Sequence, residues 1–467
     1  MSIIGGFMVP HPPIIIPEIG RGEERKIAET VESYMEIGRE IAQLAPEAIV
    51  ITSPHSILYA DYFHISPGNG ASGGFERFSA PQVRFSVEYD AQLAEEIAAQ
   101  ADQHDFPAGT MGERDASLDH GAMVPLYFID KGYAQLGREP DYKVVRIGLS
   151  ALPLLQHYAF GALISRAAAS LGRRTVFVAS GDLSHCLKKD GPYGFRREGL
   201  EYDRRIMEIM GSGSFAKLFD FEEGFLDQAG ECGHRSFVIM AGAFDGVEVE
   251  PRRLSYQDTF GVGYGICTFR SIKEDPSRNF GQCQLERERR RLQKKRAAED
   301  PYVKLARLAL ETYISVGRRA EMPGNLPEEL LNRRAGAFVS LHEGGSLRGC
   351  IGTIGPTREN LAAEIMENAV SAAVKDPRFP AVTAEELDQL EYSVDVLGRP
   401  EKILSEEELN PAKYGVIVSK DGRRGLLLPN LDGVDTAERQ IAIAKQKAGI
   451  GQEEVVQLER FEVVRHD

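Results

Sequence analysis

The sequence predicts an α/β fold for the first part of the chain, with helices packed on a sheet, and a smaller α+β domain for the rest. Two observations lead to this prediction. Apolar runs of strand length alternate with longer segments whose apolar residues recur every three or four positions, a pattern typical of a sheet covered by helices. A break in composition then separates this region from a second one that has its own strands and helices.

The first part consists of alternating elements. Strands are expected at residues 3–9, 48–52, 144–149 and 175–179, and helices at 25–44, 91–101 and 154–171. The glycine-rich segment GVGYG at 261–265 runs into a strand-like ICTF instead of opening a helix, so it does not fit a dinucleotide-binding loop.

The boundary between the two parts lies in residues 271–299, which are highly charged and nearly free of large apolar side chains. The basic run at 287–296 could contact nucleic acid or acidic lipid, but acidic residues flank it. An exposed helix joining two domains is the favoured interpretation. The expected organisation is therefore one domain over residues 1–270, a charged linker over 271–299, and a second domain over 300–467.

The second part is predicted to be a mixed α+β domain. Helices are expected at 303–316, 359–374 and 436–447, and strands at 337–341, 392–397, 416–418 and 425–428. Gly449 follows the last of these helices and is a plausible residue to end it.

The composition excludes several classes of protein. Acidic side chains number 70 against 55 basic ones, a formal net charge of -15, which argues against nucleic acid as a partner. There is no apolar run of about 18 residues that would predict a membrane span, and the first residues lack the basic segment of a signal peptide. The five cysteines form no C-x-x-C pair. A cytoplasmic protein in a reducing compartment is expected.

Four histidines lie just beyond predicted strands or beside turns: His11, His55, His120 and His185. Ligands of open α/β sheets bind outside the carboxyl ends of the strands, so side chains delivered there by different strands can converge. Two imidazoles and one carboxylate make a plausible metal triad, and Glu231 or the adjacent Cys232 could complete it. Asp182 could orient an imidazole, or it could simply cap a turn.

These segments together carry a resemblance. The motifs VPHPP, SPHS, DHGAMVPL, SGDLSH and ECGHRS resemble, in order, those of class III extradiol ring-cleavage dioxygenases and their relatives of the Memo family, over about the first 270 residues. The resemblance implies a central mixed sheet flanked by helices and a non-haem Fe(II) held by His11, His55 and Glu231. It also implies that His185 is the acid–base residue and that His120 lines the oxygen and substrate site.

The implied reaction is the cleavage of a small aromatic substrate, a catechol or a relative, by O2. A histidine that does not bind the metal can take up and return a phenolic proton, which is the role expected for His185. Memo-like proteins are similar in the last motif but have a cysteine there. If Cys232 is the third ligand, its softer sulfur would favour zinc or copper over oxygen chemistry. The alternative function is then a Memo-like metal-binding module that cleaves no ring.

The second domain resembles the AMMECR-type domain through LRGCIGTIGP, DPRFPAV, YSVDVL and GRRGLLLP, over about residues 300 to 467. The fused pair is similar to protein A of the AmmeMemoRadiSam system, which implies a radical-SAM protein and a separate Memo-like protein as partners. Arg348 and Cys350 are two residues apart in a predicted strand and share a face. They are a possible second site, in which arginine favours the thiolate, or else Cys350 is a buried structural thiol.

Overall fold

The computed structural model describes residues 2–431 and 433–467, and the chain forms two compact units that divide between Glu286 and Arg287. The division lies inside one helix, α9 (Phe280–Ala298), none of whose residues is buried. In the part of α9 that belongs to the second unit, Arg291 and Lys295 form ion pairs with Glu391 at 2.6 and 2.9 Å. Two cations of the basic run at 287–296 thus bind an acidic side chain of their own unit.

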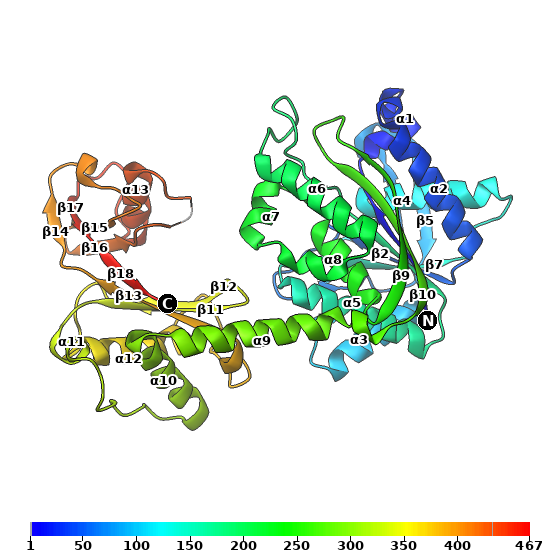
Figure 1. Ribbon diagram of the computed structural model, residues 1–467. Coiled ribbons are helices and arrows are strands. Elements are labelled where there is room, and N and C mark those ends of the chain that lie inside the picture. The colour runs from blue at the N-terminus through cyan, green and yellow to red at the C-terminus, as the bar shows by residue number, and fades with distance from the viewer. Residues whose placement is uncertain (1, 432) are drawn as a thin grey trace. The chain divides into compact units, whose positions relative to one another are not determined.

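Unit 1 is built on a six-stranded mixed sheet with the order β7–β2–β8–β1–β10–β9. Strands β2, β7, β9 and β10 of this sheet are labelled in Figure 1. The four strands at one side run parallel, and β10 runs antiparallel to both of its neighbours. This is the predicted central mixed sheet. The strands are β1 (Ile3–Val9), β2 (Ala48–Ser53), β7 (Lys143–Gly148), β8 (Thr175–Ser180), β9 (Val247–Gln257) and β10 (Tyr264–Glu274).

Helices cover both faces of this sheet, because successive side chains of its strands point to opposite faces and both sets are buried. On one face, Phe7, Ile51 and Val178 pack with side chains of α2 (Ala28–Leu44) and α4 (His120–Gln135). A continuous apolar strand such as β2 is buried at every position, which explains why its sequence shows no alternation.

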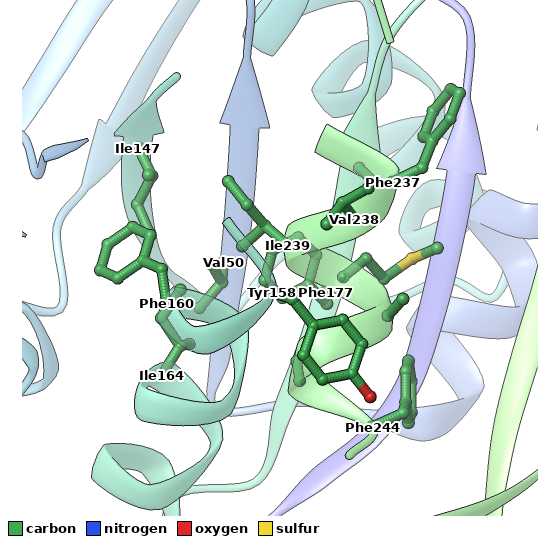
Figure 2. Close-up of a cluster of buried hydrophobic side chains, with 14 of the residues drawn as sticks. Val50, Ile147, Tyr158, Phe160, Ile164, Phe177, Phe237, Val238, Ile239 and Phe244 are labelled. Carbon is green, nitrogen blue, oxygen red and sulfur yellow. The ribbon is translucent and has the colours of Figure 1, made fainter. Parts of the chain in front are cut away.

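On the opposite face, Val50 and Phe177 pack with α5 (Leu154–Ser170) and α8 (His234–Ala243), and Figure 2 shows this cluster. The two helices touch at Gly161, where an added Cβ would lie 1.9 Å from the Ile239 carbonyl oxygen. Only glycine permits this approach, and it brings α5 and α8 together as one layer over the sheet.

The remaining elements of unit 1 surround this core. They are the helices α1 (Pro17–Gly20), α3 (Ala91–Gln103), α6 (Arg197–Ser212) and α7 (Glu223–Ala229), and the strands β3 (Phe63–His64), β4 (Gly70–Phe75), β5 (Ala80–Glu88) and β6 (Ala108–Gly109). Strands β4 and β5 form an antiparallel hairpin outside the main sheet.

Unit 2 has two four-stranded antiparallel sheets, ordered β12–β11–β13–β18 and β14–β17–β15–β16. The first packs against α10 and α12, and the second against α13. The helices are α10 (Pro301–Val316), α11 (Glu328–Asn332), α12 (Leu361–Val374) and α13 (Ala437–Lys447). The strands are β11 (Ala337–Glu343), β12 (Ser346–Gly352), β13 (Leu390–Leu397), β14 (Glu401–Ile403), β15 (Gly415–Lys420), β16 (Arg423–Leu427), β17 (Gln457–Phe461) and β18 (Val463–His466).

The α/β first part and the smaller α+β second part are confirmed, and each strand and helix expected from the sequence is present within a few residues of its predicted ends. Gly449 has φ = 65° immediately after α13, the conformation that ends a helix. The helix α4 and the hairpin β4–β5 were not predicted. Within the described residues, every helix is too short or too polar to cross a membrane.

Candidate metal centre

Three neighbouring strands of unit 1 lead into the histidine-bearing segments. Strands β2, β8 and β1 lie side by side and run parallel, so their carboxyl ends share one edge of the sheet. His11 and His55 each come two residues after the last residue of their strand, and His185 comes five residues after β8. His120 does not follow a strand of the central sheet; it is the first residue of α4.

The structure brings His11, His55 and His120 together. One ligand atom from each lies within 4.8 Å of the others, and the Nε2 atoms of His11 and His55 are 2.9 Å apart. The rings of His55 and His120 have centroids 4.0 Å apart. His185 lies outside this cluster and stacks on Tyr193, with ring centroids 5.2 Å apart.

The hydrogen bonds of His11 fix which of its nitrogens is free. The Ser180 hydroxyl lies 2.6 Å from the Gly121 carbonyl oxygen, which can only accept a hydrogen bond, so the hydroxyl donates there. The Ser180 oxygen also lies 3.0 Å from His11 Nδ1, and it must accept a hydrogen bond there, so His11 carries its proton on Nδ1. His11 Nε2 therefore carries a lone pair that points toward His55.

All four imidazoles are neutral near pH 7. Burial, reinforced by the other histidines, holds the pKa of His11 well below its usual range. Burial also lowers the pKa of His55, in spite of the nearby Asp119 carboxylate, and it lowers those of His120 and His185 to about 4. Neutral imidazoles offer lone pairs, so the cluster is ready to bind a cation without first losing protons.

The two candidates for a further ligand point in different directions. The sulfur of Cys232 lies 3.7 Å from His11 Nε2. The Glu231 carboxylate instead accepts the backbone N–H of His234, at 2.5 Å, where α8 begins. The Cys232 sulfur therefore lies beside the cluster, whereas the Glu231 side chain supports the first turn of α8 by accepting this N–H.

These residues fit a metal ion. Two nitrogens that bind one ion at about 2.0–2.1 Å and at a right angle would lie about 2.9 Å apart, as the Nε2 atoms of His11 and His55 do. A set of imidazoles with a nearby thiol suits iron, zinc or copper and is unsuited to magnesium or calcium, which prefer oxygen.

A cavity of about 1010 Å³ opens onto the cluster and is lined by His55 and His120. Its walls come from the hairpin β4–β5 and from the segment that precedes α4, and they include the apolar side chains Phe78, Phe85, Leu118 and Met123. The ring of Phe78 lies 5.6 Å from that of His120. The cavity could hold a small molecule with an apolar or aromatic part against the histidines.

Two carboxylates beside the cluster act on backbone groups. Asp182 accepts the backbone N–H of His11 at 2.8 Å, so it holds the main chain of this histidine. Asp119 accepts the N–H of Ala122 and thereby caps α4, whose first residue is His120. Asp119 was not predicted to belong to the site, although an aspartate directly before an apolar run is a helix-start signal.

The two residues of the possible second site, Arg348 and Cys350, have different partners. Arg348 forms an ion pair with Glu386 at 2.6 Å and also donates to the Pro380 carbonyl. Burial raises the pKa of Cys350, whose sulfur accepts a hydrogen bond from Ser340 at 3.2 Å. Because Arg348 is engaged elsewhere and the thiol is shielded, this arrangement favours a structural cysteine over a reactive thiolate.

Comparison with known proteins gives a consistent picture. Residues 5–267 match the family of the catalytic LigB subunit of aromatic ring-opening dioxygenase, and residues 303–466 match the AMMECR1 family. A protein of Clostridium acetobutylicum is 41% identical over 476 residues, which cover 100% of this chain and 99% of that protein. A Thermotoga maritima protein is 54% identical over 170 residues, 36% of this chain and 98% of that protein.

Among solved structures, an uncharacterized protein from Pyrococcus horikoshii is 33% identical, with a TM-score of 0.33, and the match covers 35% of this chain and 88% of that one. The family matches confirm the resemblances carried by the sequence motifs. The chain therefore belongs to the family of the catalytic LigB subunit of aromatic ring-opening dioxygenase, and it carries an AMMECR1 domain after that subunit-like part.

Proposed function

We propose that unit 1 is a metal-dependent oxidoreductase of the extradiol type, which acts with O2 on a catecholic or related aromatic substrate. The observation that carries the proposal is the cavity of about 1010 Å³ that opens onto His55 and His120, two members of the three-histidine cluster. A cluster of neutral imidazoles at the end of a partly apolar cavity can bind a metal and present it to a small molecule.

In this proposal the metal is Fe(II), held by the nitrogens of His11, His55 and His120 with Cys232 as a further donor. When bound, Fe(II) supplies redox chemistry with O2 and Lewis acidity toward phenolic oxygens. The ring of Phe78 and the neighbouring apolar walls contact the aromatic part of the substrate and exclude water from it.

His185 is the proposed acid–base residue. Its imidazole is neutral near pH 7, so a ring nitrogen can accept a phenolic proton from the substrate and return it later. The ring lies outside the three-histidine cluster, which leaves it free to move protons. Tyr193 stacks on it and restrains its orientation.

A second function is favoured by one specific observation, the position of Cys232 beside His11. A sulfur donor also suits zinc or copper; with either of these ions in place of iron, unit 1 is a Memo-like metal-binding module that cleaves no ring. Such a module would act in a complex, for which a radical-SAM protein and a separate Memo-like protein are the proposed partners, with unit 2 in an accessory role.

The test is elemental analysis of protein purified without oxygen, followed by oxygen uptake with a panel of catechols. We expect about one iron per chain and uptake that disappears in His185→Ala while iron stays bound. Bound metal without uptake on any catechol would contradict the dioxygenase and support the metal-binding module. Protein that binds no metal would contradict both functions.

A further inference from the structure

Two buried serine hydroxyls connect the histidine segments to the first turn of α4. Ser180 is the last residue of β8 and is fully buried. Its hydroxyl accepts the Nδ1–H of His11 at 3.0 Å and donates to the Gly121 carbonyl at 2.6 Å. Both hydrogen-bonding capacities are used in fixed directions, so the His11 ring is held in one orientation and one tautomer.

Ser53 occupies the equivalent place at the end of β2 and is also fully buried. Its hydroxyl accepts the backbone N–H of His55 at 3.2 Å and donates to the Asp119 carboxylate at 2.5 Å. Asp119 is the residue that caps α4 and directly precedes His120. A single hydroxyl thus links the segment that carries His55 to the helix end that carries His120.

The two links meet at Gly121, the second residue of α4. Its carbonyl accepts the Ser180 hydroxyl, and a Cβ added to it would lie 2.2 Å from the Ser53 oxygen. Even alanine at this position would therefore push the Ser53 hydroxyl out of place. The first turn of α4 is packed so closely on both serines that neither hydroxyl can turn without breaking a hydrogen bond.

We propose that Ser53 and Ser180 are positioning residues, which set the His55 and His11 imidazoles against the first turn of α4 so that three ring nitrogens converge before any ligand binds. Buried hydroxyls whose donor and acceptor are both satisfied hold their partners rigidly. The consequence for metal affinity rests on the proposed function, whereas the orientation of the rings in metal-free protein does not.

The experiment compares Ser180→Ala and Ser53→Ala with Ser255→Ala, a matched control. Ser255 lies in β9, is buried, and has a hydroxyl without a hydrogen-bond partner among the described residues. The first readout is the 15N NMR spectrum of the histidine rings in metal-free protein. The second is Zn2+ affinity, measured by competition with a chromophoric chelator, and thermal unfolding verifies that each variant is folded.

Ser180→Ala should lose the fixed Nδ1–H form of His11 and bind Zn2+ about 10- to 100-fold more weakly, the usual cost of losing a group that orients a metal ligand. Ser53→Ala should keep that form of His11 and still bind Zn2+ more weakly, while Ser255→Ala should match the wild type in both readouts. Ser180→Thr, which restores a hydroxyl, should recover the Nδ1–H signal.

An unchanged His11 tautomer in Ser180→Ala would overturn the proposal, as would Zn2+ affinities in both variants equal to that of Ser255→Ala. Should Ser180→Ala fail to fold, an unchanged Zn2+ affinity in Ser53→Ala alone would overturn it. A wild-type protein that binds no Zn2+ or Fe2+ would contradict the proposed function, and the NMR spectra would still decide whether the serines position the rings.

Discussion

Residues 231 and 232 are adjacent in the chain but serve different purposes in the structure, and separate substitutions should reveal this. The Cys232 sulfur lies 3.7 Å from His11 Nε2, whereas the Glu231 carboxylate binds the N–H of His234 at the start of α8. Cys232→Ser should therefore weaken metal binding, and Glu231→Gln should leave metal binding unchanged.

The expected changes in metal affinity and in the free energy of unfolding follow from these contacts. Exchange of a sulfur ligand for a hydroxyl should lower the Zn2+ affinity at least about tenfold, or about 1.4 kcal/mol. The loss of a group that only hydrogen-bonds to a metal ligand and orients it already costs that much. In Glu231→Gln the amide oxygen can still accept the His234 N–H. The free energy of unfolding should consequently change by less than about 1 kcal/mol, the value of one neutral hydrogen bond.

The assay is titration with Co2+, which reports thiolate ligation through a sulfur-to-metal charge-transfer band in the near ultraviolet. The band should be present in the wild type and in Glu231→Gln, and absent in Cys232→Ser. Loss of metal affinity in Glu231→Gln with full affinity in Cys232→Ser would show that Glu231, the ligand expected from the sequence, binds the metal and Cys232 does not.

Three further outcomes are expected. His185→Ala should retain one metal ion per chain by elemental analysis and lose oxygen uptake, because the ring lies outside the cluster; loss of the metal would contradict its role. Burial raises the pKa of Asp203 to about 7, whereas the same group in the unfolded chain loses its proton near pH 4. As the pH rises from 4 to 7, the free energy of unfolding should therefore fall by up to about 1.4 kcal/mol per pH unit. Urea unfolding at several pH values should show a flatter dependence in Asp203→Asn, and an identical slope would exclude this cause. Gly161→Ala should lower the thermal midpoint, since it forces α5 away from α8 at a cost of about 1–3 kcal/mol, and an unchanged midpoint would show that the helices can separate freely.

The strands of the central sheet could be predicted because their sequences are nearly continuous apolar runs of strand length. The segment 48–53, for example, is buried at every position in β2. Helix α4 was missed for a related reason. It is buried almost all round and contains Pro125, so its sequence shows neither the apolar stripe nor the uninterrupted pattern by which surface helices are recognised.

The convergence of histidines could also be anticipated, because strand ends of parallel strands meet at one edge. The direction in which a loop side chain points could not be anticipated from the sequence. Cys232 faces His11 because its loop packs on the segment after β8, where the Asp182 N–H donates to the sulfur at 3.3 Å.

The claim that unit 1 holds a metal through its histidine cluster is tested most directly by X-ray absorption on protein loaded with one equivalent of Zn2+. We expect nitrogen ligands at about 2.0–2.1 Å together with one sulfur at about 2.3 Å. We also expect that His11→Ala no longer takes up the ion. A spectrum with oxygen ligands only, or full zinc uptake by His11→Ala, would show that the histidine cluster does not hold the metal.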